Sequence, residues 1–366
     1  MLGNCMVDSG AREAMCKLLA RGQQDKAPDA VAVTNVGPGL VALLSSRSAA
    51  VQEKALTLCG NMCGHEALRC ALAAQKGLLD AAVAALFAPP VPMAGTDAQQ
   101  VAWQQQLAGV QHAAAAMLYN ISLDSDVQAA LLDSPSAAAA TGEQGAHVGC
   151  MLQLLERPGC DLRLAARVAG TVARCFKHPL RPRQQPGSRH LEQLLVLLRR
   201  CSSDAANDTV KPDEDSPGVA AADAVVRCLT LCTQDDGAEG SLACEHLVKL
   251  EGPALLLQVV RQLLPPKPGQ GASSGGTAAS PLHATKKTRE SLLGNAALCL
   301  GHLARSADVL PVLHRLDAVQ PLVAVAYEGK GNVSSKNAAI SLARMAKQPQ
   351  MLERLRELHG IEIIYQ

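Results

Sequence analysis

Residues 292–303 read LLGNAALCLGHL, and residues 334–345 read SSKNAAISLARM. Placing Asn295 on Asn337 superposes two copies of one pattern at an offset of 42 residues. An internal period near 40 residues, with apolar residues at helical spacing, is typical of stacked helical repeats. The pair therefore predicts a chain built from copies of one helical unit.

Each copy has an apolar face that it cannot cover alone. In the first copy, Ala296, Cys299, Leu300 and Leu303 recur at i, i+3, i+4 and i+7, which makes one apolar stripe. Small residues such as Gly301 let a neighbouring helix approach closely. The expected fold is an all-α, right-handed α-solenoid of about six repeats, each with a short first helix, a second helix and a longer third helix.

The pattern recurs along the whole chain. The positions equivalent to Leu303 in the other copies are Met62, Ile121, Cys175, Cys232 and Met345. Their uneven spacing indicates loops inserted into a common unit. We expect residues 1–366 to form a single helical domain. Because Met1 falls in the middle of a copy, we also expect the array to have lost, or to continue into, a segment before it.

Segments rich in Pro, Gly, Ser and Asp interrupt the helical pattern. Such segments cannot bury enough apolar surface to order themselves. The predicted flexible insertions are residues 88–98, 133–147, 202–218 and 265–287.

Composition limits the fold and the class of partner. Apolar residues make up 48% of the chain but aromatic residues only 2%, so the core must be aliphatic, which favours helices over a sheet. The formal charge of +1 predicts no global attraction to nucleic acid or to membranes. No apolar run approaches the length of a membrane-spanning helix.

The 13 cysteines form no CxxC pair. Cys59 and Cys63, like Cys228 and Cys232, are spaced i, i+4 inside apolar runs, which predicts small core residues. No cluster offers four ligands, so we expect no metal site and no cofactor. The odd count and the lack of a secretory leader favour a reducing, cytoplasmic location.

Several stretches resemble armadillo repeats. The segments VQEKALTLCGNMC (51–63), HAAAAMLYNIS (112–122) and GNAALCLGHLA (294–304) are similar to armadillo third helices, and GPGLVALLSS (37–46) is similar to a second helix. The last two copies also resemble the armadillo region of a family that couples tetratricopeptide repeats to armadillo repeats. That resemblance implies a role in cytoplasmic preassembly of axonemal dynein arms. The chain shows no 34-residue tetratricopeptide pattern, so no chaperone-tail binding carries over from that module.

The armadillo resemblance implies a concave groove lined by the third helices. Importin-type members carry an Asn near the end of each third helix and a Trp four residues earlier. Only Asn61 and Asn120 match the Asn position here, and Arg174, His302 and Arg344 stand at other copies of it. No Trp stands at the other position, which argues against a nuclear transport receptor.

Seven residues before the same positions lie Lys54, Arg167, Asn295 and Asn337. With the five residues above, they are expected to line a polar, mildly basic groove for a protein client. The alternative is that they are ordinary solvated positions. For Asn295 and Asn337 a second alternative is hydrogen bonding between helices.

Residues 163–200 contain nine Lys or Arg and one acid, Glu192. A basic stripe of this kind suits an acidic partner segment, although the acidic loop that follows could neutralise it. Nucleic acid would require aromatic platforms, and Phe176 is the only aromatic residue in the stretch. We therefore expect no nucleic-acid partner.

Catalytic motifs are missing. His65-Glu66 is followed by Arg69 where a zinc-binding HExxH motif needs His, and neither a phosphate-binding GxxxxGK[ST] loop nor a GxSxG motif occurs. The sequence thus predicts a non-catalytic scaffold whose groove holds a protein client, with dynein subunits or chaperones as the clients that the resemblance implies. The alternative is an armadillo adaptor or co-chaperone in another pathway.

Overall fold

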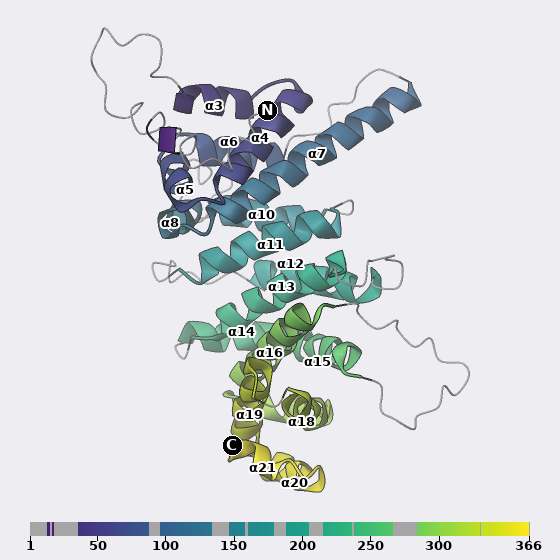
Figure 1. The fold of residues 1–366 in the computed structure, drawn as a ribbon. Helices are drawn as coiled ribbons and strands as arrows, with labels where there is room; N and C mark the ends of the chain where they lie inside the picture. Colours follow the sequence, from purple (N-terminus) through teal and green to yellow (C-terminus); the bar gives the residue numbers. More distant parts are fainter. Residues whose placement is uncertain are drawn as a thin grey trace. The chain divides into compact units, whose positions relative to one another are not determined.

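The computed structural model describes the helical parts of the chain. The described residues are 13, 14, 17, 36–87, 96–133, 146–157, 160–178, 188–204, 215–235, 238–265, 284–329 and 331–365. Within them every regular element is a helix, as the sequence predicts (Figure 1). No described helix combines the length and the apolar composition that a membrane span requires.

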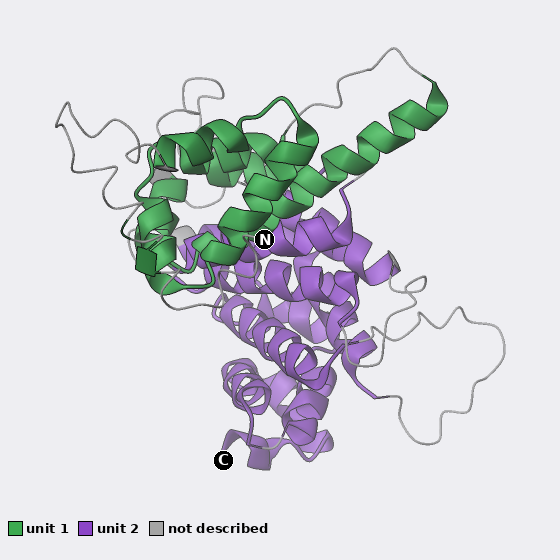
Figure 2. Cartoon of the chain, turned by 45° about the horizontal axis from the view of Figure 1, so that its top comes forward, with its two compact units in different colours: residues 1–154, 178–181 green, residues 155–177, 182–366 purple. Residues whose placement is uncertain are grey.

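Contacts divide the chain into two compact units (Figure 2). Unit 1 comprises Met1–Leu154 and His178–Arg181, and unit 2 comprises Leu155–Lys177 and Pro182–Gln366. The expectation of a single domain over residues 1–366 stays a prediction.

Unit 1 is built around the pair α4 (Ala49–Met62) and α7 (Asp97–Ile121), which pack along each other. Its other helices are α3 (Val36–Leu44), α5 (Glu66–Ala73), α6 (Leu78–Leu86), α8 (Ser125–Asp133) and α10 (Ala146–Leu155). The second-helix positions are taken by α3 and α6, which contact each other and cover α4 and α7 respectively.

Unit 2 has two main layers of helices. One layer is the series α11 (Leu162–Phe176), α13 (Pro217–Thr233), α16 (Lys286–Leu303) and α19 (Val333–Met345), in which each helix packs on the next. The other layer is α12 (Ser188–Asp204), α15 (Gly252–Leu263) and α18 (Val319–Glu328). The remaining helices are α14 (Ala238–Lys249), α17 (Leu310–Arg315), α20 (Pro349–Glu357) and α21 (Ile361–Ile364).

We call α4, α7, α11, α13, α16 and α19 the third helices. The six equivalent apolar positions predicted from the sequence all fall on the last or the penultimate residue of these helices. In unit 2 each third helix also starts at a side chain that caps it by accepting a hydrogen bond from a backbone N–H of the first turn. The capping residues are Asp161, Ser216, Thr285 and Asn332.

The core is aliphatic, as the composition predicts. Leu, Val and Ala supply most of the buried side chains, and cysteines fill many of the remaining small positions. Cys59, Cys63, Cys228 and Cys232 have no exposed surface, which confirms their predicted place in the core. Burial raises the pKa of the Cys59 and Cys63 thiols to about 12, so both are protonated at neutral pH.

The predicted insertions lie mostly outside the described residues. Helices extend into several of their described edges: α7 begins at Asp97, α12 runs to Asp204, and α16 begins at Lys286. Capping explains two of these edges, because Thr96 and Thr285 each start a helix inside a stretch that composition alone assigns to a loop.

Candidate functional site

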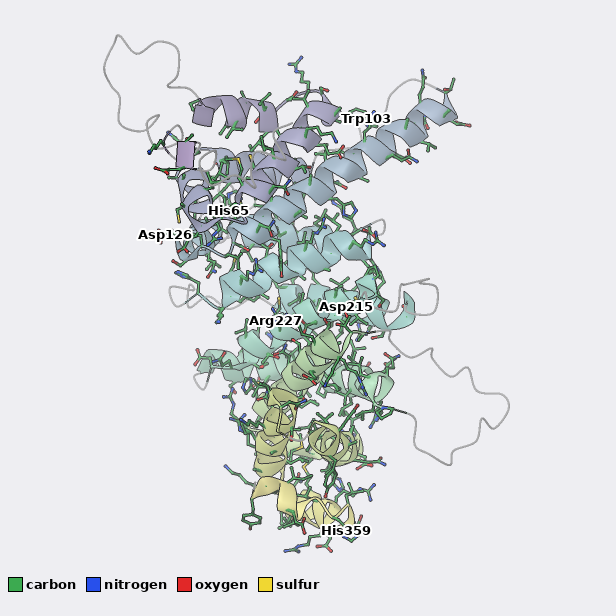
Figure 3. The ribbon with its side chains drawn as sticks, in the orientation of Figure 1. His65, Trp103, Asp126, Asp215, Arg227 and His359 are labelled. Atoms are coloured by element: carbon green, nitrogen blue, oxygen red, sulfur yellow. The ribbon has the colours of Figure 1, made fainter. Side chains whose placement is uncertain are left out.

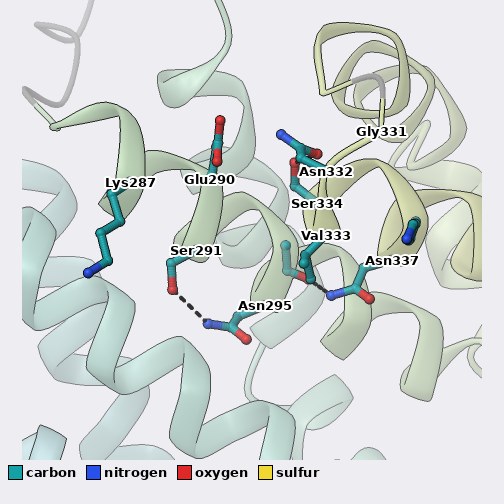
Figure 4. A pocket seen from close by; sticks show the side chains of 11 residues that line it. Lys287, Glu290, Ser291, Asn295, Gly331, Asn332, Val333, Ser334 and Asn337 are labelled. Atoms are coloured by element: carbon teal, nitrogen blue, oxygen red, sulfur yellow. Dashed lines mark hydrogen bonds between the residues drawn. The ribbon is translucent and has the colours of Figure 1, made fainter.

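A hollow of about 440 Å³ opens between the first three turns of α16 and the N-terminal part of α19 (Figure 4). From α16 it is lined by Lys287, Glu290, Ser291, Gly294 and Asn295. The other side is formed by Gly331, Asn332, Val333, Ser334, Lys336 and Asn337. The hollow thus brings together Asn295 and Asn337, the two residues from which the internal repeat was recognised.

Hydrogen bonds fix the α16 side of the hollow to α13. Asp223 Oδ1 accepts from Ser291 Oγ at 2.8 Å and from Asn295 Nδ2 at 3.3 Å. The other carboxylate oxygen of Asp223 pairs with Arg227 at 2.6 Å. Asp223 therefore holds Asn295 in place, and Arg227 remains at the surface of α13 (Figure 3).

A second carboxylate secures the start of α16. Asp215, just before α13, accepts from the backbone N–H of Thr285 at 2.7 Å and from Thr288 Oγ1 at 2.6 Å. Thr285 is itself the capping residue of α16. Because this link joins the residues at the start of α13 to the start of α16, the first turn of α16, which carries Lys287, has a fixed position beside α13.

The α19 side is fixed to α16 through main-chain acceptors. Asn337 Nδ2 donates to the carbonyl of Gly294, Ser341 Oγ to that of Ala297, and Arg344 to that of Gly301, at 3.0, 2.7 and 3.0 Å. We call these three bonds the stacking ladder. They occupy successive turns of α16, so the two helices are held along most of their length.

Glycine makes this close approach possible. A Cβ on Gly301 would lie 3.2 Å from the Cα of Ser341, and one on Gly294 would lie 3.3 Å from the Cα of Ser334. In unit 1 an equivalent contact recurs: Asn120 Nδ2 donates to the carbonyl of Gly60 at 3.0 Å. The predicted close approach at Gly301 is therefore confirmed.

The predicted groove residues have three kinds of surroundings. Lys54, Asn61 and Arg167 are exposed, whereas Asn120, Arg174, Asn295, Asn337 and Arg344 are half-buried. His302 is only 5% exposed and lies between α13 and α16, with its Nδ1 3.2 Å from Thr233 Oγ1. The alternative reading of Asn295 and Asn337 as bonding residues between helices is confirmed, and Asn120, His302 and Arg344 prove to have the same role.

Of the residues that line the hollow, only Asn295 and Asn337 were predicted, and the exposed Lys287, Val333 and Lys336 are among those that were not. Val333 is 70% exposed, and Ile340, on the same face of α19, is 45% exposed. Val333, Lys336 and Ile340 recur at i, i+3 and i+7, a spacing that places side chains on one helical face. That spacing is visible in the sequence, but which face of α19 is open is set by the packing on α16 and α18.

Charge is distributed unevenly over unit 2. Its third helices, α11, α13, α16 and α19, carry nine Lys or Arg and two acids. Its other helices carry eight Lys or Arg and eight acids. The net positive charge of the helices of unit 2 is therefore confined to one layer.

Within the described part of the chain, no group of three or more His, Cys, Asp or Glu side chains is placed to hold a metal ion. The buried thiols offer no strong nucleophile, because burial raises the pKa of Cys175 and Cys299 to about 12. The arrangement offers surfaces for binding: a hollow, exposed lysines and exposed apolar side chains.

The fold and the site define a helical-repeat protein, and comparison with solved structures agrees. An engineered protein of known crystal structure superposes with a TM-score of 0.51 over 85% of this chain and 96% of its own, at 15% identity. At that identity the likeness concerns the fold alone. No protein-family model matches the chain.

Two curated proteins share a short stretch with this chain. Tetratricopeptide repeat protein 12 of Mus musculus is 38% identical over 77 residues, and that of Homo sapiens is 36% identical over 77 residues. Each match covers 20% of this chain and 11% of the relative. The chain is thus similar to a small part of a much longer protein.

Proposed function

We propose that this chain is a non-catalytic scaffold that binds a protein client along its third helices. The observation that carries the proposal is the α16–α19 face, where the hollow lies beside the exposed Val333, Ile340 and Lys336. Apolar side chains exposed next to a concave, polar-lined surface are typical of sites that bind partners.

The polar groups at the hollow suit an extended peptide. The Nδ2 atoms of Asn295 and Asn337 donate to Asp223 and to the Gly294 carbonyl, while their Oδ1 atoms accept no hydrogen bond from a described residue. Each Oδ1 atom is therefore available to a backbone N–H of a client. The hydrogen bonds between helices hold both amides in fixed orientations, which reduces the loss of side-chain entropy when a client binds.

The client we propose is a component of axonemal dynein arms, or a chaperone acting on one, during cytoplasmic assembly. Two observations support it: the resemblance of the last two repeats to the tetratricopeptide–armadillo family, and the short stretch shared with tetratricopeptide repeat protein 12. The excess of Lys and Arg on the third helices disfavours a transport receptor, since like charges would repel a Lys- and Arg-rich cargo.

Site-specific photo-cross-linking tests the scaffold. A photoreactive phenylalanine analogue replaces Ile340 on α19 or, as a matched control, Val196 on α12, both β-branched and both 45% exposed. In ciliated cells we expect cross-linked client from the Ile340 site at several times the yield from the Val196 site. Equal yields, or none from Ile340, would contradict a client on the third helices.

Mass spectrometry of the cross-linked protein then tests the identity of the client. Dynein arm subunits or their chaperones are the expected products. Products from another pathway would leave the scaffold standing and favour the alternative, an adaptor outside ciliary assembly.

A further inference from the structure

We infer that the third-helix face of unit 2 binds an extended protein segment rich in Asp and Glu that also carries an apolar side chain. This inference rests on the proposed scaffold function and gives the client its chemistry. It is carried by the charge of that layer, by two lysines that form no ion pair with a described residue, and by two exposed apolar side chains on α19.

The charge bias is a property of the layer and not of the chain. The whole chain has a formal charge of +1, yet the four third helices of unit 2 carry nine Lys or Arg against Asp223 and Glu290. Such segregation produces a local positive potential that a neutral total charge conceals. A potential of this kind attracts acidic segments and speeds their association.

The cations nearest the hollow are open to a partner. Lys287 and Lys336 line it from α16 and α19, both are exposed, and neither forms an ion pair with a described residue. By contrast, Arg289 on the same first turn of α16 pairs with Glu328 of α18 at 2.5 Å. Because Lys287 and Lys336 form no ion pair with a described residue, a carboxylate of the client can pair with them without breaking an existing ion pair.

The apolar requirement comes from Val333 and Ile340. At a rise of about 1.5 Å per residue, their separation of seven positions is roughly 10 Å along the α19 axis, with Lys336 and Asn337 between them. An apolar side chain of the client would pack between the two and remove both from water. Carboxylates on either side of it would reach Lys287 and Lys336.

Fluorescence polarisation with labelled peptides and the full chain tests this inference. The acidic peptide alternates Glu and Leu; the others replace Glu by Gln or by Lys, and a single-stranded RNA is the fourth probe. The acidic peptide should bind about tenfold or more tightly than the others and weaken as salt rises. Equal binding of the Gln peptide, or tighter binding of the RNA, would overturn the inference.

Charge-reversed variants locate the binding. Lys287→Glu with Lys336→Glu should weaken the acidic peptide about tenfold or more. The control, Lys249→Glu with Arg315→Glu, changes the total charge equally on α14 and α17 and should leave the affinity within about twofold. All four side chains are exposed, so both variants should keep the helical circular dichroism. An equal loss in both variants would show general attraction and would refute a site at the hollow.

The apolar part has its own test. Val333→Ser with Ile340→Ser should weaken the Glu–Leu peptide and leave a Glu–Ser peptide unaffected; an equal effect on both would remove the apolar contact from the inference. If clients cross-link at Ile340 while the acidic peptide fails to bind, this inference falls and the scaffold stands. If cross-linking at Ile340 also fails, both fall.

Discussion

Gly301 lies where α16 and α19 come closest, and replacing it with Ala tests whether that contact holds the array together. A Cβ at this position would lie 2.2 Å from Ser341 Oγ, 3.0 Å from its Cβ and 3.2 Å from its Cα. The hydroxyl could rotate away only by giving up its bond to the Ala297 carbonyl at 2.7 Å. The Cα atom is part of the backbone of α19 and the Cβ atom is bonded to it, so neither can rotate away and α19 would have to shift.

The balance of energies predicts a loss of stability. In an open helix, Gly→Ala is favourable by about 1 kcal/mol because Ala has the higher helix propensity. Overpacking a tight interface costs about 1–3 kcal/mol, and losing the Ser341 hydrogen bond adds roughly 1 kcal/mol. We therefore expect Gly301→Ala to destabilise the α16–α19 pair by about 1–3 kcal/mol.

Gly39 in α3 supplies the control, because nothing lies within 4 Å of a Cβ placed there. Gly39→Ala should stabilise α3 by up to about 1 kcal/mol, the opposite sign from Gly301→Ala. Native-state hydrogen exchange of peptides covering each helix measures both local free energies separately, which suits an array whose parts can open independently.

A double-mutant cycle isolates the steric cause. Ser341→Gly removes two of the three clashing atoms, so its combination with Gly301→Ala should be less destabilising than the sum of the single changes. If Gly301→Ala instead stabilised α16 as an ordinary helical site would, the close approach of α16 and α19 would be refuted.

Three further outcomes follow from individual side chains. Asn337→Ala, which leaves the Gly294 carbonyl without its donor, should cost roughly 0.5–1.5 kcal/mol at α19, and unchanged exchange there would contradict the ladder. Alkylation followed by peptide mapping should modify the exposed Cys70 in the folded chain and reach the buried Cys299, whose pKa is raised to about 12, only on unfolding. Burial lowers the pKa of His147 below the 6.5 of the unfolded chain, so unfolding takes up protons and stability should fall as pH drops through about 6.5. His147→Gln should flatten that dependence in thermal melts, and an unchanged slope would exclude His147 as its source.

The sequence predicts the fold well because each helix of the repeat packs mainly on its neighbours, so the same apolar positions recur in every copy. The equivalence of Leu303 and Met345 needs only the periodicity of apolar residues, and both side chains lie buried near the ends of their helices. Helix starts were harder to place. Thr285 begins α16 inside a stretch of loop-like composition because it caps the helix and because Asp215, 70 residues earlier, holds it.

The site was only partly predictable, because a polar residue at a third-helix position has two possible destinations. Asn295 and Asn337 were recognised, and they do reach the hollow. His302 stands at the position in α16 that Arg344 occupies in α19, yet it is buried against Thr233, since its ring faces α13 and not solvent. Position in a repeat gives the face of a helix, whereas the neighbouring helix decides how much of that face stays open.

The stacking ladder has a consequence for how such an array changes over time. Asn337, Ser341 and Arg344 in α19 all donate hydrogen bonds to backbone carbonyl groups, which every amino acid supplies. A helix in the position of α16 can thus change nearly all its side chains and still accept hydrogen bonds from the next helix, provided that glycine persists where the two backbones come closest. Copies joined in this way can diverge in sequence while the stack stays continuous, and the exposed residues that bind a partner can change on one copy without disrupting its packing on the next.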